Sequence, residues 1–434
     1  MRRLTLIASL LLILLGGCQS SQTTPTVMTP SSTQTPTPTL TPTATSTSPP
    51  PTSPAPTTPP DTLTPTPASQ PLPALREGQN VTITEIHMVT TTQGWAIGYQ
   101  DAKLDHVLYT EDGGETWFDR SPPITISQST EQTIHAKGFF LDENHGWAKF
   151  YLDAPPPPLA PQYLWRTTDA GKTWQISQPL PLLGEEFYFI PTGFTFLDPD
   201  QGWLLVNVDS GMNHEYSSLY TSKDGGVSWE RILTPPGNGL QIAQNTAMLF
   251  ANENLGWVTK DAPVVAKGPF IEKTTDGGYA WNTYFLPAPE NINFDNDDIF
   301  CKTYSPAFTS SQTRLLLLSC QHTEKDQIYQ YVYATTDSGE SWQIFQLPSE
   351  VFELEFLDFE TGYAFGRDIY KTVNGGENWE KVKSVTWEGQ FSFVDENHGW
   401  AVARKEDDIS LVFTENGAQT WQMLEPIISL EQDQ

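Results

Sequence analysis

Carboxylates are the side chains of this 434-residue chain that could do chemistry most directly, and two groups of them stand out. Glu185 and Glu186 are adjacent, and a carboxylate pair supplies the acid and the base of glycoside hydrolases. Neighbouring residues of an extended strand point to opposite sides, so these two cannot flank one bond. Asp295, Asp297 and Asp298 cluster the oxygen atoms that Ca²⁺ prefers, but their loop lacks the Gly and the later Glu of an EF-hand. We predict no catalytic residue, no metal site and no cofactor, with calcium at this loop as the alternative.

A recurring box of eight residues contains most of the other candidates. Each copy begins with Thr or Ser, has Asp or Asn two positions later, contains Gly and ends in Trp, as in residues 110–117. A side-chain oxygen at the second of these positions can bond the backbone of its own turn, and Asn keeps that oxygen without the charge. We therefore interpret the boxes as structural turns. Their turn residues are Asp112, Asp169, Asp224, Asp276, Asp337, Asn374 and Asn416.

A second motif, Phe-x-Asp-x-x-x-Gly-Trp, precedes six of the boxes. It is clearest at residues 140–147, 196–203 and 393–400. His145 and His398 occupy the same position of two copies, so we assign them to the repeat and not to a metal site. The variants are Gly94-Trp95, Gly256-Trp257 and Gly362-Tyr363, and the fifth repeat has lost its Gly-Trp.

Together the two motifs predict the fold. Each repeat contains four short runs in which Trp, Val, Ile, Tyr and Phe alternate between Gly, Asp and Asn clusters, a pattern typical of half-buried strands. Repeats of about 40 to 50 residues with four strands each are the signature of a β-propeller. We predict an all-β, seven-bladed β-propeller of four-stranded antiparallel blades over residues 76–434.

The box resembles the Asp-box, or bacterial neuraminidase repeat. Coupled to the second motif, over residues 80–425, it is most similar to the photosystem II stability and assembly factor family. This resemblance implies a seven-bladed propeller that assists the assembly of a membrane-protein complex. Sialidases, sortilin-type receptors and xyloglucan-cleaving glucanases share the box alone.

The residues that these enzymes need are not recognisable in this chain. Sialidases hold a carboxylate with three converging Arg side chains, and no Arg here maps clearly to an innermost strand. Xyloglucanases need two propellers that face each other, whereas this chain has one. We therefore predict a binding protein without enzymatic activity, with a glycoside hydrolase as the alternative.

The binding face is predicted on the loops opposite the motif turns, because these loops vary in length and carry acidic and aromatic residues. Such side chains suit a basic protein patch or a sugar stacked on an aromatic ring. Trp387 is the strongest candidate because it lies outside the repeat. The candidates are Trp387, Tyr151, Asp153, Glu185, Glu186, Tyr216, Asp295, Asp297 and Asp298.

The N-terminus resembles a bacterial lipoprotein signal. Arg2 and Arg3 precede an apolar run that ends before Cys18. This run is too short to span a membrane. Residues 19–75 are almost entirely Thr, Pro and Ser and have no apolar face to bury. We predict a signal peptide at 1–17, a lipidated Cys18 with a disordered stalk through residue 75, and a monomeric propeller anchored outside the cytoplasm by its lipid alone.

Cys301 and Cys320 are the other cysteines of the chain. In an exported protein an isolated pair indicates a disulfide, which would close a loop worth about 3 kcal/mol. Two buried free thiols are the alternative.

The net charge limits the partners. The chain has 23 Lys and Arg against 52 Asp and Glu, a formal charge of −29. Nucleic-acid binding requires a basic face, so we exclude it and expect a protein with a basic patch or a neutral glycan.

Overall fold

The structure is a computed structural model whose described residues all belong to the unit Pro65–Gln434. They contain strands and turns and no helix, so none of them forms a helix that could cross a membrane. The predicted signal peptide and Cys18 lie outside them. The described residues are 69–127, 133–152, 161–184, 186–211, 214–234, 241–242, 247–259, 268–294, 299–304, 307–308, 314–322, 327–348 and 351–429.

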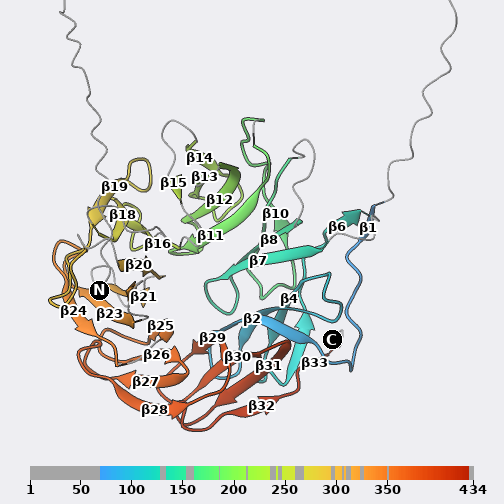
Figure 1. The fold of residues 1–434 in the computed structure, drawn as a ribbon. Coiled ribbons are helices and arrows are strands. Elements are labelled where there is room, and N and C mark those ends of the chain that lie inside the picture. The colour runs from blue at the N-terminus through green and yellow to red at the C-terminus, as the bar shows by residue number, and fades with distance from the viewer. Residues whose placement is uncertain are drawn as a thin grey trace, which may run out of the picture. The chain divides into compact units, whose positions relative to one another are not determined.

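Seven antiparallel sheets form a ring, which confirms the predicted seven-bladed β-propeller (Figure 1). Blade 1 contains β2 (Thr82–Met88), β3 (Gly94–Tyr99), β4 (His106–Thr110), β5 (Thr116–Asp119) and β33 (Ile427–Ile428). Blade 2 contains β7 (Ile134–Phe140), β8 (Gly146–Leu152), β9 (Trp165–Thr167) and β10 (Gln175–Ile176). Blade 3 contains β11 (Ile190–Phe196), β12 (Gly202–Gly211), β13 (His214–Ser222), β14 (Glu230–Leu233) and β15 (Gln241–Ile242).

The remaining four blades follow in chain order. Blade 4 contains β16 (Met248–Phe250), β17 (Gly256–Thr259), β18 (Phe270–Thr274) and β19 (Asn282–Phe285). Blade 5 contains β20 (Ile299–Thr303), β21 (Ala307–Phe308), β22 (Arg314–His322), β23 (Gln327–Thr335) and β24 (Gln343–Gln346). Blade 6 contains β25 (Val351–Phe356), β26 (Gly362–Gly366), β27 (Asp368–Thr372) and β28 (Glu380–Ser384). Blade 7 contains β29 (Glu388–Phe393), β30 (Gly399–Lys405), β31 (Asp408–Thr414) and β32 (Gln422–Leu424).

The folded unit begins earlier than the predicted stalk boundary at residue 75. β1 (Ser69–Pro71) pairs antiparallel with β6 (Thr125–Ser127), and Leu75 packs against the core of blade 1. This corrects the boundary. The residues after the Thr- and Pro-rich run fold because later parts of the chain contact them. β6 pairs with β1, and the cluster on which Leu75 packs includes Trp400 and Ile428.

The Phe-x-Asp-x-x-x-Gly-Trp motif packs each blade on the next. In blade 3 the Phe196 ring lies over Gly202, where a Cβ would come within 2.5 Å of it. The same ring stacks on Trp147 of blade 2, with centroids 3.6 Å apart. Glycine is required because the aromatic ring occupies the space of its side chain, and the buried Trp supplies a large apolar area.

The C-terminal strand β33 closes the ring. It lies between β5 and the segment that precedes β2, both of blade 1. β33 pairs parallel with β5, and on its other side Val81 N donates to Pro426 O at 3.0 Å and Gly78 N donates to Ile428 O at 2.8 Å. At the inner edge, Gln390 of β29 accepts a hydrogen bond from Ile86 N of β2 at 2.9 Å. The chain therefore joins its last blade to its first at both the outer and the inner strands.

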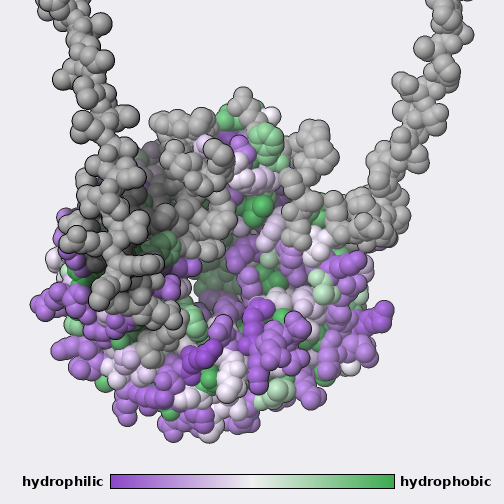
Figure 2. All heavy atoms as spheres, in the orientation of Figure 1, coloured by the Kyte–Doolittle hydropathy of each residue, from purple (hydrophilic) through white to green (hydrophobic). Residues whose placement is uncertain are grey.

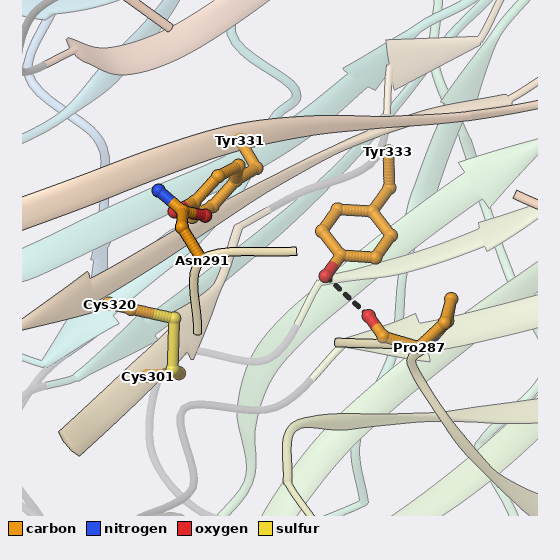
Figure 3. The surroundings of a disulfide bond; sticks show 6 residues. All are labelled: Pro287, Asn291, Cys301, Cys320, Tyr331 and Tyr333. Atoms are coloured by element: carbon orange, nitrogen blue, oxygen red, sulfur yellow. Dashed lines mark hydrogen bonds between the residues drawn. A yellow bond between two sulfur atoms is a disulfide. The ribbon is translucent and has the colours of Figure 1, made fainter. Parts of the chain in front are cut away.

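Two hairpins extend beyond the others. β12 and β13 pair in blade 3, β22 and β23 in blade 5, and each of these four strands has nine or ten residues. In blade 5 a disulfide joins Cys301 and Cys320, which are directly paired on β20 and β22 (Figure 3). Beside it, Tyr331 donates to Asn291 Oδ1 at 2.8 Å and Tyr333 to Pro287 O at 2.7 Å. These contacts tie the connection after blade 4 to the blade 5 hairpin.

Candidate functional site

The ring has two distinct faces. The turns that join strands one and two of a blade, and the boxes that join strands three and four, lie at the same end, which we call the turn face. Backbone hydrogen bonds connect them, as from Gly225 N to Asp200 O at 2.8 Å and from Gly417 N to Asn397 O at 2.9 Å. The connections between strands two and three and between blades form the opposite end, which we call the loop face.

The box carboxylates act within their own turns. In blade 5, Ser341 donates to Asp337 through its Oγ at 2.6 Å and its N at 2.9 Å, and Thr335 Oγ1 donates at 2.7 Å. These hydrogen bonds lower the pKa of Asp337 to about 2. The same arrangement recurs around Asp112 and Asp224. Over the described ranges, His, Cys, Asp and Glu nowhere form a group of three that could hold a metal ion.

The predicted acidic loop face depended on Asp153, Glu185, Asp295, Asp297 and Asp298, which lie outside the described residues, so it stays a prediction. Among the described residues, the turn face carries many carboxylates. Its exposed carboxylates greatly outnumber its exposed lysines, Lys172 and Lys223. On the loop face, the exposed charges are mixed and include Asp101, Glu388, Glu406, Asp407 and Asp408 together with Lys103, Arg367, Arg404 and Lys405. The exposed carboxylates of the turn face are Glu111, Asp112, Glu115, Asp198, Asp200, Glu253, Asp276, Asp337, Glu340, Asp358, Glu360, Glu377, Glu396 and Glu415.

Glu186 is a structural residue and not a free binding group. Its carboxylate forms a buried ion pair with Arg231 at 2.7 Å and accepts the backbone N–H groups of Leu183 and Gly184 at 2.8 Å. Burial alone would raise the pKa of Glu186, but these hydrogen bonds lower it. The partner Arg231 belongs to another part of the chain, so the local sequence did not reveal this role.

Trp387 also packs within the fold. Its ring lies 5.6 Å from Phe391 in a stacked arrangement and 5.6 Å from Trp421 edge-on. Tyr151 and Tyr216 are half-buried, and Tyr216 packs against the blade 3 core. Binding by these three remains a prediction. The candidates Asp153, Glu185, Asp295, Asp297 and Asp298 lie outside the described residues, as does the calcium alternative.

Two carboxylates of the innermost strand of blade 6 were not singled out from the sequence. Glu355 accepts a hydrogen bond from Phe393 N of β29 at 2.8 Å, while its other oxygen is buried without a partner among the described residues. Burial raises the pKa of Glu355 to about 7, and burial with the nearby Glu355 charge raises that of Glu353 to about 8. The neutral Ser392 has the equivalent contact with Met88 N in the next blade, at 2.9 Å. These acids therefore join blades, and they sit on one strand rather than across a substrate.

A Ser, a His and an Asp meet in blade 1 without forming a catalytic triad. His106 Nδ1 lies 2.9 Å from Asp119 Oδ2 and 3.3 Å from Ser121 Oγ. In a triad the two partners contact different ring nitrogens, whereas here both contact Nδ1. Ser121 Oγ also accepts Val107 N at 3.0 Å, so the cluster holds the end of β5 against β4.

Apolar side chains are exposed on the loop face of blades 3 and 5. Leu183 and Phe187, in the connection that enters blade 3, are 57% and 67% exposed. On blade 5, Phe300 and Ile328 are 38% and 41% exposed. Large apolar residues gathered on one face often mark a binding surface.

No protein-family model matches the chain. Two curated proteins match part of it, both named xyloglucanase Xgh74A and both from Acetivibrio thermocellus. Each is 22% identical over 257 residues, which is 55% of this chain. The chain spans only 28% of the length of these relatives.

Solved structures with a similar fold include YCF48 bound to a D1 peptide, and the GH74 xyloglucanase from Xanthomonas campestris. The first is 17% identical and covers 80% of this chain and 96% of its own, with a TM-score of 0.48. The second is 14% identical and covers 84% of this chain and 56% of its own, with a TM-score of 0.49. At these values the two structures carry no argument about function.

The match to the xyloglucanases corrects the prediction that the chain is not an enzyme. That prediction depended on the missing sialidase residues and on the single propeller. The curated relatives are named for the cleavage of a glycan, and more than half of this chain aligns with them. Activity on a glycan therefore belongs among the functions to be tested.

Proposed function

We propose that the chain is a lipid-anchored, extracytoplasmic propeller that binds a protein partner through apolar side chains of its loop face. The observation that carries the proposal is the pair Phe300 and Ile328. Both are paired with Gln321, Phe300 from β20 and Ile328 from β23, so the three residues share one side of the blade 5 sheet.

The opposite side of the same strands shows why this exposure is notable. Cys301, Cys320 and Tyr329 occupy the next positions along β20, β22 and β23. The two cysteines are buried with Ile292 and Phe294. The hairpin is therefore held rigidly on one side and presents apolar groups to solvent on the other, which favours recognition with little loss of conformational entropy.

Blade 3 offers a second apolar position on the loop face. Phe187 N donates to Val208 O at 2.9 Å, which fixes the exposed Phe187 beside the long β12–β13 hairpin. Blades 3 and 5 flank blade 4, so a partner that contacts both must span one blade. A partner with apolar residues at its centre and basic residues at its edge would also suit the predicted acidic loop of Asp295, Asp297 and Asp298.

The proposal is tested by affinity capture from solubilised envelope of the source cell, with the full chain as bait. We compare the double variant Phe300→Thr, Ile328→Thr with a matched control, Tyr284→Thr, Phe285→Thr, which alters exposed residues of the outer strand β19. We expect the first variant to lose one discrete protein that the wild type and the control retain. Equal capture by both variants would contradict the proposal.

Recognition of a glycan is the second candidate function, and the alignment with xyloglucanases favours it. The direct test is incubation of the purified chain with xyloglucan, measuring both binding and the release of reducing ends. Binding or cleavage supports this function, and the absence of both contradicts it for that polysaccharide.

A further inference from the structure

A cavity of about 560 Å³ lies on the turn face between blades 6 and 7. Its walls come from the blade 6 box with the start of β28, and from the blade 7 turn and box. Hydrophilic side chains dominate the visible surface of these two blades (Figure 2). Side-chain amides and one Trp form much of the lining, namely Asn374, Asn378, Asn397, Asn416, Gln419 and Trp379.

The cavity coincides with a departure from the repeat. Five boxes carry Asp at the turn position, and the two that carry Asn are the two that line this cavity. Asn374 Oδ1 still accepts the backbone N–H of Asn378 at 3.0 Å, so the turn itself keeps its hydrogen bond. The fold does not need the change from Asp to Asn, which points to a role in the cavity.

The changed residues carry hydrogen-bond donors where carboxylates would only accept. In blade 7 one of these donors is already used, because Asn416 Nδ2 donates to Thr420 Oγ1 at 2.8 Å. In blade 5 the hydroxyl of Ser341 donates a hydrogen bond to the second carboxylate oxygen of Asp337. Blade 6 has Asn378 at that position, and the amide nitrogen of Asn374 has no protein partner among the described residues. A side-chain amide donates and accepts at once, as the hydroxyl groups of a sugar also do.

Trp379 adds an aromatic surface to the cavity wall. Its ring is half-buried against Phe356, edge-on at 6.0 Å. The equivalent Trp117 and Trp229 donate their indole N–H to Gly114 O and Gly226 O at 2.9 and 3.1 Å. The N–H of Trp379 has no such partner within the described part of the chain, but it is buried, so Trp379 can offer a ligand only its ring. A sugar ring has an apolar C–H face that packs on an aromatic ring, so this wall suits such a ligand.

The charges around the cavity cancel. Two lysines and two glutamates line it, Lys371, Lys381, Glu380 and Glu396. Lys371 is paired with Glu396 at 2.7 Å, and Lys381 with Asp368 at 2.8 Å. An anionic ligand would meet the surrounding acidic face and find both lysines already paired, so an uncharged ligand fits better.

We propose that the cavity between the blade 6 and blade 7 boxes binds a neutral sugar residue of a glycan. Amide groups bond the sugar hydroxyls, and Trp379 packs against the ring. This proposal names the site for the second candidate function, and it is separate from the loop-face partner, because it lies at the opposite end of the ring.

The test uses the purified full chain and a panel of neutral oligosaccharides of glucose, xylose, galactose and mannose units, measured by isothermal titration calorimetry. The double variant Asn374→Asp, Asn416→Asp restores the residue that five other boxes tolerate, so it retains the fold while making the cavity anionic. Asp224→Asn, in the blade 3 box, is the matched control. We expect at least one oligosaccharide to bind both the wild type and the control. The same oligosaccharide should bind the double variant with an affinity at least about tenfold lower.

The outcomes separate the site from the function. If no oligosaccharide binds the wild type at millimolar concentration, both the cavity site and glycan recognition are overturned. If an oligosaccharide binds wild type and double variant equally, glycan recognition stands but the cavity assignment is wrong. Trp379→Leu provides an independent check, because it keeps an apolar side chain beside Phe356 and removes the aromatic face, and it should weaken binding.

Discussion

The indole ring of Trp203 in blade 3 lies flat against the ring of Phe250 in blade 4, with centroids 3.7 Å apart and planes within 3°. Its N–H donates to Gly277 O, in the box of the same blade 4, at 2.8 Å. Trp147 makes the same two contacts with Phe196 and Gly225. Each such Trp thus holds the next blade by its Phe and by its box, which explains why the two motifs occur together.

Replacing one of these Trp side chains should destabilise the propeller strongly. Trp203→Ala removes a buried aromatic stack and a hydrogen bond, and we expect the free energy of unfolding to fall by about 3 to 5 kcal/mol. Met423→Ala, at a side chain that is 68% exposed on β32, should change it by less than about 0.5 kcal/mol. Urea unfolding followed by Trp fluorescence measures both. Similar effects of the two substitutions would contradict the packing role.

Closure by the C-terminal strand predicts different effects of substituting two neighbouring residues, Ile428 and its control Ile427. Ile428 is 2% exposed within the blade 1 core, whereas Ile427 is 36% exposed. We expect Ile428→Ala to lower the free energy of unfolding by about 2 to 4 kcal/mol, and Ile427→Ala to have a much smaller effect. Thermal denaturation of both variants tests this. A larger effect at Ile427 would show that β33 is not seated as described.

Glu355 predicts a pH dependence above the range of ordinary carboxylates. Its pKa rises from 4.5 to about 7 on folding, so the folded chain binds the proton more tightly and stability falls as pH rises through this window. Glu355→Gln cannot ionise, and we expect it to reduce the loss of stability between pH 5 and pH 8 by about 1 kcal/mol or more. The exposed Glu388→Gln should leave that loss unchanged. An identical pH profile in wild type and Glu355→Gln would refute the assignment.

The box carboxylates predict the opposite dependence at low pH. Asp337 has a pKa lowered to about 2, so its contribution to stability is present above 3.8 and is lost as pH falls toward 2. Ser341→Ala removes the strongest hydrogen bond, and we expect the pKa of Asp337, measured by an NMR titration, to rise toward 3.8. Thr336→Ala changes an exposed neighbour and should not affect it. A pKa near 3.8 in the wild type would show that the box hydrogen bonds do not hold in solution.

The repeat predicted the blades because each position that recurs within it makes one particular contact in the fold. Gly202 leaves room for Phe196, and Phe196 in turn stacks on Trp147. The site was less predictable, because its contacts join residues far apart in the sequence. Glu186 is neutralised by Arg231, and Trp387 is covered by Trp421, neither of which local spacing reveals.

Other features were visible in the sequence but had no evident meaning there. Asn374 and Asn416 depart from Asp, yet only their position around one cavity gives the change a function. Glu353 and Glu355 alternate along an inner strand, and a strand pattern alone does not tell which side faces the next blade. The contact between neighbouring blades, in which Phe393 N of blade 7 donates to Glu355 of blade 6, decides that.

Site-specific photo-cross-linking of the full chain in its source cells tests the proposed function most directly. A photoreactive amino acid is placed at Ile328, at Phe187 or, as a control, at Tyr284 on the outer strand β19. We predict one discrete protein adduct, the same from Ile328 and Phe187, and none from Tyr284. No adduct from the loop-face positions, or the same adduct from Tyr284, would contradict it.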